Sequence, residues 1–355
     1  CPFNIYDQNT GSQLARFPEV GKSMTIEIKD NKLFLADHPF KNQVLKIEPD
    51  PPCMIGLNGE KYRGRLYIHF DSDKKNFSVI NHIPLEPYLA GVVGAEMPRY
   101  WEQQALNAQA VASRTYCLYT KNRFARNRSW DVKKTQANQV YKGIAVEAPQ
   151  IWKAVNTTFG QVLKYKNENN DYEIFPTYYS SACGGHTEDC KNVFGEYFPP
   201  LKGVKCPYCK NVAKPKYYFW SSVEYTTEQI TRKLVNNYPS LEKLGTIDEI
   251  IPVQKSEYKN FTRNTHIKLV GSTGKTDSLR AEDFRLTLDS SGAIMKSTIF
   301  KIMRYGEKWL FYAGRGYGHG VGLCQCGTQA LARQGLNYPK ILEYYYPGSK
   351  IEKLY

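Results

Sequence analysis

The stretch from Pro87 to Tyr119 constrains the fold of this 355-residue chain most, because it predicts two helices separated by a fixed break. The first helix is expected over residues 87–95, with its proline in the first turn, where a missing N–H does no harm. Pro98 disfavours the helical conformation for Met97, so the chain has to turn there. The second helix is expected after Trp101, where alanine, the best helix former, recurs.

Glu96 is the residue at this break that can carry chemistry. It stands at the end of the apolar segment GVVGAEMP. A carboxyl group packed there away from water has a raised pKa, because desolvation disfavours its charged form. A raised pKa is what a general acid needs. The alternative is that Glu96 caps a helix end or pairs with Arg99 or Arg114 on the surface.

The composition indicates a globular protein with an anionic partner. Hydrophobic residues make up 41% of the chain, enough for a real core, and the formal net charge is +14. A basic surface fits nucleic acid, an anionic membrane or an acidic wall polymer. The basic runs are short and no nucleic-acid-binding motif is recognisable. We therefore expect a cell-wall or membrane-surface partner and no nucleic acid.

The start of the chain suggests export. No apolar stretch approaches the ~18 residues of a membrane span. The first residue is Cys1 rather than methionine, as in a mature chain whose signal has been removed. Because bacterial lipoprotein processing leaves such a cysteine, Cys1 is a candidate lipid anchor, and we expect an exported protein of the cell envelope. A chain end that falls at a cysteine by chance is the alternative.

The predicted fold class is α+β, with mixed strands and helices around a glycan-binding groove. Residues 1–58 are expected to form a small β-rich N-terminal segment, since apolar residues alternate there, and residues 59–355 a second, larger domain. Helices are predicted over 227–237, capped by Thr226, and over 320–334, and a strand over 217–219.

Two further segments have patterns typical of binding sites. Residues 178–194, YYSSACGGHTEDCKNVF, hold hydroxyls and a Gly-Gly pair that permits close backbone approach to a ligand. Residues 314–330, GRGYGHGVGLCQCGTQA, contain five glycines in nine positions but lack the ending of a phosphate loop. His319 in this loop is a candidate for orienting a carboxylate or a sugar hydroxyl. Structural roles, a tight turn and a structural histidine, are the alternatives.

These three segments together resemble the signatures of the stage II sporulation protein D family, over roughly residues 60 to 355. The resemblance implies a peptidoglycan lytic transglycosylase, in which the Glu of the EMP tripeptide, Glu96 here, is the catalytic acid/base. It implies cleavage between N-acetylmuramic acid and N-acetylglucosamine in peptide-stripped strands, with 1,6-anhydro ends and no required cofactor. The residues expected to bind substrate are Gln109, Arg114, Tyr178, Ser180, Gly184, Gly185, Arg315, His319 and Gln325.

The same resemblance leaves a second function open. Some relatives are described as modifiers that assist a cell-wall amidase, so the alternative is a non-catalytic glycan-binding protein in which Glu96 is a structural cap. A wall amidase is an expected partner in either case.

The cysteines depart from the family pattern. Some members bind zinc through a Cys/His pair just before QVY, where this chain has Ala137 and Asn138. The chain instead has a spaced set with a C-x-x-C end, which suits a structural zinc or two disulfides: Cys183, Cys190, Cys206 and Cys209. Disulfides are preferred, because an exported protein meets an oxidising compartment. Cys324 and Cys326 are expected to pair with other cysteines rather than with each other.

Overall fold

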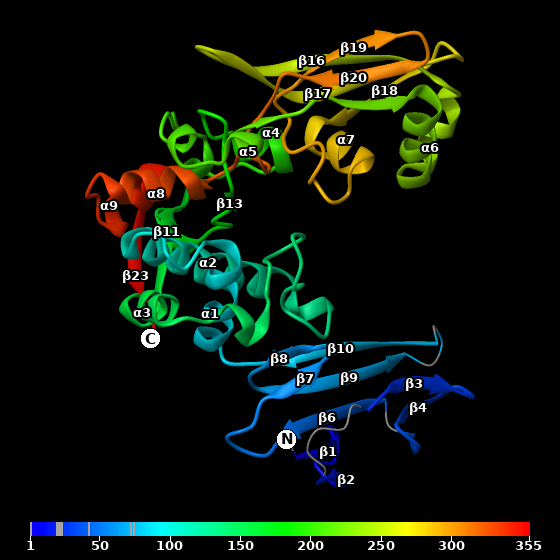
Figure 1. Cartoon of the computed structure of the whole chain (residues 1–355), viewed down its shortest axis with the longest axis vertical. Helices are drawn as coiled ribbons and strands as arrows, with labels where there is room; N and C mark the ends of the chain where they lie inside the picture. Colours follow the sequence, from blue (N-terminus) through cyan, green and yellow to red (C-terminus); the bar gives the residue numbers. More distant parts are fainter. Residues whose placement is uncertain (1, 19–23, 42, 72, 74) are drawn as a thin grey trace. The chain divides into compact units, whose positions relative to one another are not determined.

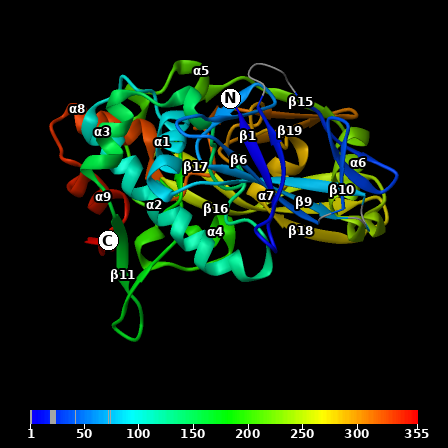
Figure 2. The ribbon, with the colours of Figure 1, turned by 90° about the horizontal axis from the view of Figure 1, so that it is seen from below.

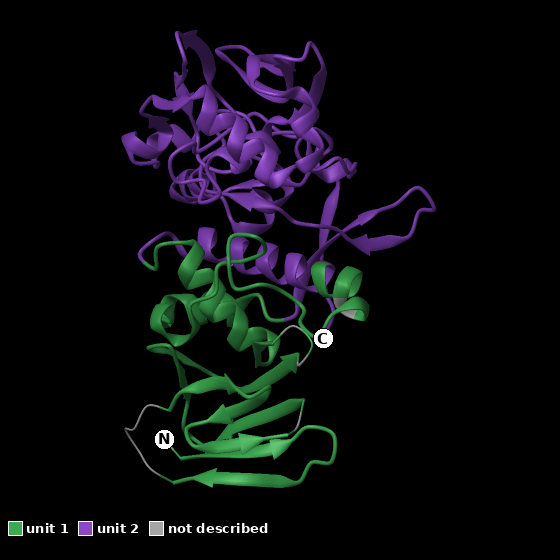
Figure 3. Ribbon diagram, turned by 90° about the vertical axis from the view of Figure 1, so that its right-hand side faces the viewer, with its two compact units in different colours: residues 1–99, 120–159 green, residues 100–119, 160–355 purple. Residues whose placement is uncertain are grey.

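The computed structural model describes residues 2–18, 24–41, 43–71, 73 and 75–355, and Cys1, the candidate lipid anchor, lies outside them. Helices and several small sheets alternate along the chain, as Figure 1 and Figure 2 show from two directions, and this confirms the predicted α+β class. The chain divides into two compact units (Figure 3). Unit 1 comprises residues 1–99 and 120–159, and unit 2 comprises residues 100–119 and 160–355.

Unit 1 is built on an antiparallel five-stranded sheet in the order β10-β9-β6-β1-β2. Its strands are β1 (Phe3–Asp7), β2 (Gln13–Phe17), β6 (Val44–Pro49), β9 (Arg65–Asp71) and β10 (Asn76–His82). Every second side chain of β6 and β9 is buried, as in Leu45, Ile47, Leu66 and Ile68. The sheet joins strands from both sides of residue 58, and the predicted domain boundary there stays a prediction.

Smaller elements complete unit 1. Strands β3 (Ile26–Lys29), β4 (Lys32–Leu35) and β5 (His38–Phe40) form one small sheet, and β7 (Ile55–Leu57) pairs with β8 (Glu60–Tyr62). Helix α1 spans Leu85–Glu96 and packs against α3 (Pro149–Thr157). The predicted break is confirmed, because Met97 has the extended conformation (φ −128°, ψ 142°) directly before Pro98.

Helix α2 (Gln103–Phe124) begins after Trp101, as predicted, and most of it belongs to unit 2. Its alanines at 105, 108, 110 and 112 are completely buried, so neighbouring chain segments approach the helix closely. The Thr177 hydroxyl donates to the carbonyl of Ala112 (2.7 Å), and the Leu163 amide donates to Thr115 Oγ1 (2.9 Å). The alanine-rich pattern thus produces a central helix of unit 2.

Five small sheets make up the β structure of unit 2. Around α2 lie β11 (Gln161–Lys166), which pairs with β12 (Tyr172–Ile174) and β23 (Ser349–Lys353), and the parallel pair β13 (Tyr179–Ser180) and β22 (Leu323–Cys324). The remaining strands form three sheets. One pairs β14 (Phe219–Trp220) with β21 (Gly314–Arg315), and one has the order β15 (Val223–Thr226), β20 (Lys308–Tyr312), β19 (Lys301–Tyr305). The third has the order β16 (Ile247–Tyr258), β17 (Phe261–Gly271), β18 (Thr276–Arg280). The helices are α4 (Cys190–Phe194), α5 (Pro215–Tyr218), α6 (Thr227–Asn237), α7 (Ala281–Leu288), α8 (Gln325–Arg333) and α9 (Tyr338–Tyr345).

The part of unit 2 between α5 and β21 has its own hydrophobic core. Helices α6 and α7 lie against the sheets of β15 to β20 (Figure 1), and the core contains Leu234, Ile267, Phe284 and Phe311. Helix α6 begins at the predicted cap, where the Thr226 hydroxyl accepts the Gln229 amide (3.1 Å) in a capping box. Local capping chemistry is therefore sufficient to predict this helix.

Two predicted elements have wrong bounds. A strand was expected over residues 217–219, but only Phe219 belongs to one, β14; Tyr217 and Tyr218 lie in α5, because Pro215 occupies its first turn, where its fixed φ favours a helix. The helix expected from residue 320 begins only at Gln325, because Gly320 and Gly322 have positive φ and Leu323 and Cys324 form β22. Within the described part of the chain, no helix combines the length and apolar character needed to cross a bilayer.

Candidate functional site

Glu96 is the last residue of α1 and belongs to unit 1. Its side chain is partly exposed, and one carboxylate oxygen accepts the backbone N–H of Val140 at 3.1 Å. Val140 lies in the segment Gln139-Val140-Tyr141, which follows α2 in the chain. This amide could not be identified as a partner from the sequence, since a backbone donor has no residue signature.

Two glycines on α1 determine how closely that segment approaches. A Cβ atom added at Gly91 would stand 2.4 Å from Cε2 of Tyr141, and one added at Gly94 would stand 2.2 Å from the Val146 carbonyl oxygen. The Tyr141 hydroxyl donates to Asn81 Oδ1 (3.0 Å), which fixes the ring over the helix. The small residues of the GVVG pattern therefore serve to bring the Val140 amide to Glu96.

Unit 2 brings the second and third signatures together. The parallel pair β13 and β22 places Ser180 opposite Cys324, directly before Gln325. His319 joins the two segments, because its Nε2–H donates to the Tyr179 carbonyl and its Nδ1 accepts the Val321 amide, both at 3.0 Å. The ring of Tyr178 lies 5.9 Å from that of His319. Tyr178, Ser180, His319 and Gln325 therefore form one group of neighbours.

His319 is neutral in this arrangement. Burial lowers the pKa of its imidazole to about 4, although the nearby carboxylate of Glu282 acts in the opposite direction. Because both ring nitrogens are engaged with the backbone, a sugar hydroxyl would have to displace one of these bonds. The histidine holds the two signature loops together, and its predicted contact with substrate stays a prediction.

Gly184, Gly185 and Arg315 form a second group in unit 2. Gly185 has φ +124°, and a Cβ atom there would stand 2.9 Å from Arg315 Nη2, so only glycine lets the guanidinium approach. The Arg315 guanidinium donates to the Tyr218 hydroxyl (2.8 Å) and lies 4.4 Å from the centre of the Phe261 ring. The arginine is thus held rigidly by an aromatic and a phenolic partner.

This second group borders a cavity of about 770 Å³. Gly185 and Arg315 line it. The other lining residues include aromatic, basic and acidic ones: Tyr218, Phe219, Tyr258, Phe261, Lys205, Lys210, Lys259 and Glu257. Rings suit the faces of sugars, and cations suit anionic substituents on them. The lining thus combines aromatic rings with more basic than acidic residues.

Gln109 and Arg114 of α2 were predicted to bind substrate, but both side chains are completely buried in unit 2. Gln109 donates to the Ser113 hydroxyl (2.9 Å) and its oxygen lies 3.5 Å from Gln325 Nε2, while Arg114 donates to the Gln161 carbonyl (3.1 Å). In this structure neither side chain reaches solvent, so a direct contact with glycan would need the helix surroundings to open. Their role toward substrate stays a prediction.

Glu188 is a buried acid that sequence reasoning did not single out. Its carboxylate accepts hydrogen bonds from Asn192, Ser256 and Tyr258 (each 2.8 Å) and lies 3.5 Å from Arg263 Nε. The only sequence signal was its place in the second signature. Because its carboxylate oxygens accept these hydrogen bonds, Glu188 stabilises the loop of the second signature and is not available as a catalytic acid.

Tyr100 is an exposed aromatic residue that sequence reasoning did not single out. It follows Glu96 by four residues, and 78% of its side chain is exposed. An exposed aromatic ring of this size can stack on a sugar. Its position directly after the EMP-Arg turn was the signal that could have identified it.

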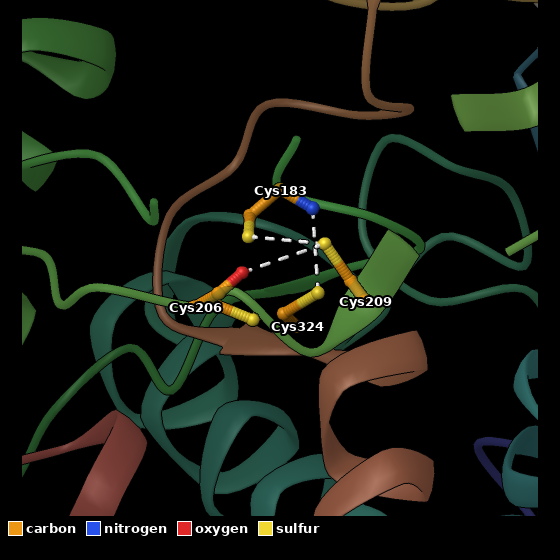
Figure 4. A group of neighbouring side chains, drawn as sticks. All are labelled: Cys183, Cys206, Cys209 and Cys324. Carbon is orange, nitrogen blue, oxygen red and sulfur yellow. Dashed lines mark hydrogen bonds between the residues drawn. The ribbon is translucent and has the colours of Figure 1, made fainter. Parts of the chain in front are cut away.

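The cysteines that lie together differ by one residue from the four that were predicted as possible metal ligands. Cys183, Cys206 and Cys209 gather with Cys324, and the ligand atoms of all four lie within 4.8 Å of one another (Figure 4). Cys190 lies in α4 outside this four-cysteine cluster. The preferred disulfides are not formed, since these cysteines and Cys190 are free and the Cys183 and Cys209 sulfur atoms are 3.7 Å apart. A disulfide needs ~2.05 Å. Cys326 is also free, so the pairing expected for Cys324 and Cys326 with other cysteines is wrong.

Two protein-family models match two separate segments of the chain. A family model described as Stage II sporulation protein matches residues 73–165, which include Glu96 and Val140. A second model, Domain of unknown function (DUF8618), matches residues 206–322, from the C-x-x-C segment into the third signature. The acid-bearing segment and the cavity-bearing segment are thus recognised separately.

Among the related proteins, a stage II sporulation protein D of Bacillus amyloliquefaciens is 30% identical over 292 residues, which cover 78% of this chain and 76% of that protein. An uncharacterized protein of Brachyspira hyodysenteriae (strain ATCC 49526 / WA1) is 33% identical over 295 residues, 83% of this chain and 73% of that protein. An amidase enhancer of Bacillus subtilis (strain 168) is 29% identical over 368 residues, 93% of this chain but 50% of that protein. The chain belongs to the stage II sporulation protein D family, which confirms the resemblance of its three signatures.

Proposed function

We propose that this protein is a peptidoglycan lytic transglycosylase in which Glu96 acts as the single acid and base. The observation that carries the proposal is the placement of Glu96: it ends α1 at a fixed turn, remains partly exposed, and is held by the Val140 amide. Positioning of this kind is what a catalytic carboxylate requires. The matched family segment, residues 73–165, contains every one of these parts.

The reaction needs one carboxyl group and no water. Protonated Glu96 gives its proton to the glycosidic oxygen, and the bond between C1 of N-acetylmuramic acid and that oxygen breaks. The 6-hydroxyl of the same sugar then attacks C1 and closes a 1,6-anhydro ring. Its proton passes to the Glu96 carboxylate, which restores the starting acid. Hydrolysis would instead use a second carboxylate to activate water.

The few acidic residues of the other two signatures are compatible with this single-carboxylate mechanism. Glu188 is buried and accepts several hydrogen bonds, and Asp189 caps α4 by accepting the Lys191 amide (2.8 Å). The third signature, residues 314–330, contains no acidic residue. Glu188 is therefore engaged by its neighbours, Asp189 serves as a helix cap, and the third signature supplies no carboxylate.

The expected substrate is a glycan strand from which an amidase has removed the peptides. The cavity beside Arg315 combines aromatic rings with three lysines, which suits the acidic lactyl groups that such stripping exposes. We place the reaction in the cell envelope, where this polymer is found. We further propose that the Ser180 hydroxyl, buried and without a partner among the described residues, is a hydrogen-bonding group for the glycan.

The second candidate is a modifier that assists a wall amidase and cleaves nothing. The amidase enhancer of Bacillus subtilis supports it, because its match extends over 93% of this chain. In that case the cavity binds glycan for the partner enzyme, and Glu96 only caps α1. The two candidates share the polymer and differ in whether a glycosidic bond breaks.

The experiment is to incubate the purified protein with peptide-stripped glycan strands and to weigh the products by mass spectrometry. Transglycosylation gives new ends that are one water lighter than hydrolysed ends. Products of this mass would support the proposal, and hydrolysed ends would replace it by a glycosidase. Intact strands, together with faster peptide release by an added wall amidase from peptidoglycan that still carries its peptides, would favour the modifier instead.

A further inference from the structure

The four-cysteine cluster of unit 2 brings together residues from three distant parts of the chain. Cys183 follows β13, Cys206 and Cys209 flank a short loop, and Cys324 ends β22. All four side chains are completely buried, and Figure 4 shows their sulfur atoms facing a common centre. Cys324 stands 115 residues beyond Cys209 in the chain, so only the fold assembles the group.

The distances fit one metal ion. Four thiolates in a tetrahedron at the ~2.3 Å length of a zinc–sulfur bond are ~3.8 Å apart. The Cys183 and Cys209 sulfur atoms are 3.7 Å apart, and no pair of ligand atoms in the cluster exceeds 4.8 Å. The spacing is too long for S–S bonds of ~2.05 Å. A cluster of several irons would hold its four thiolates further apart than one ion does.

Two of the sulfur atoms have neighbours that can donate hydrogen bonds to a metal-bound thiolate. The backbone N–H of Cys183 donates to Cys324 Sγ at 3.3 Å. The Tyr345 hydroxyl lies 3.2 Å from Cys206 Sγ and can donate to it. Donors of this kind surround metal-bound thiolates and orient them. The pair Cys206-x-x-Cys209 adds the spacing that zinc ligands commonly have.

We propose that the four-cysteine cluster binds one Zn²⁺ ion as a closed, structural four-thiolate site. Zinc suits the site because it has no geometric preference from its d electrons and accepts tetrahedral sulfur ligands. Four protein ligands and complete burial leave no open position for water or substrate, so the ion has no catalytic role. The site depends on the described contacts of unit 2 and not on the proposed cleavage activity.

The ion would join the two signature loops of unit 2 to one wall of the cavity. Cys183 directly precedes Gly184 and Gly185, and Cys324 directly precedes Gln325. Pro207, between the other two ligands, lines the cavity. Loss of the metal is therefore expected to loosen both loops and the cavity wall at once, since binding of a structural zinc is coupled to folding.

The test is elemental analysis of the full chain, purified without added metal, for zinc and iron. We expect about one zinc per chain, and at least a tenfold lower content in Cys206→Ser and Cys324→Ser. The matched control is Cys190→Ala, which removes another fully buried cysteine that lies outside the cluster and should leave the zinc content unchanged.

A second measurement covers variants that fail to fold. Wild-type protein refolded with Co²⁺ alone should show the visible and near-ultraviolet absorption of a tetrahedral four-thiolate site, and one equivalent of Zn²⁺ should abolish it. Three results would each overturn the proposal. The first is iron in place of zinc, and the second is S–S bonds among the four cysteines. The third is wild-type protein that holds less than about a tenth of an ion per chain and shows no cobalt spectrum.

Discussion

Replacement of Gly91 by alanine should lower the activity much more than the stability, because the added methyl group displaces the Val140 amide that donates to Glu96. The new Cβ would stand 2.4 Å from Tyr141 Cε2 and 2.9 Å from the Gly143 carbonyl oxygen. Carbon atoms pack at ~3.5 Å or more, so the Tyr141 segment has to move away by about 1 Å. The neighbouring Val140 amide, now 3.1 Å from Glu96, would then lie about 4 Å away, beyond hydrogen-bond distance.

The two free-energy terms of this variant oppose each other. Overpacking costs about 1–3 kcal/mol, whereas alanine is about 1 kcal/mol better than glycine inside a helix, so the net destabilisation should be about 0–2 kcal/mol. A misplacement of about 1 Å near the reacting groups can lower the rate by roughly a hundredfold. We therefore expect a 10- to 100-fold slower release of anhydro products from a protein that remains folded.

The assay compares the initial rate of product formation with the thermal unfolding midpoint. Gly56→Ala is the matched control, because a Cβ atom there meets nothing within 4 Å, and its rate should equal that of the wild type. A Gly91→Ala protein with the wild-type rate would refute the reasoning that the close approach to α1 positions the Val140 amide.

Two further variants test the unit 2 groups. Burial lowers the pKa of His319 to about 4 in the folded chain, whereas in the unfolded chain the imidazole has its ordinary pKa of about 6.5. As the pH falls from about 6.5 to about 4, the unfolded chain therefore binds a proton that the folded chain does not, and the free energy of unfolding decreases. Between pH 7 and pH 4.5 the wild type should therefore lose about 2 kcal/mol more than His319→Asn in denaturant titrations, and equal losses would contradict this assignment. Arg315→Lys removes the bond to the Tyr218 hydroxyl and the stacking on Phe261, so binding of peptide-stripped glycan should weaken about tenfold in calorimetry, with unchanged affinity as the contrary result.

Features set by neighbouring residues could be predicted from the sequence. Pro98 fixes Met97 in an extended conformation whatever surrounds it, and the Thr226 hydroxyl with Gln229 forms a capping box within one helical turn. The end of α1 at Glu96 and the start of α6 follow from these local interactions. The three signatures also predicted the family, because their residues stand together in the sequence.

Features set by contacts between distant residues could not be predicted. Nothing near Cys183 in the chain indicates Cys324 rather than Cys190 as its neighbour, since the pairing of β13 with β22 creates that contact. Polar side chains on α2 looked suited to ligand contact, but the packing around the helix buries Gln109 and Arg114 completely. The backbone partners of His319 and the contacts of Glu188 likewise appear only in the folded chain.

The most direct test of the central claim is the product assay with Glu96→Gln. Glutamine keeps the shape of the side chain but has no proton to give, so the release of anhydro products should fall by about 10²- to 10⁴-fold while the unfolding midpoint is unchanged. Glu102→Gln, which alters an exposed acid six residues further along the same signature, should retain the wild-type rate. Anhydro products formed by Glu96→Gln within tenfold of the wild-type rate would contradict the assignment of Glu96 as the acid and base.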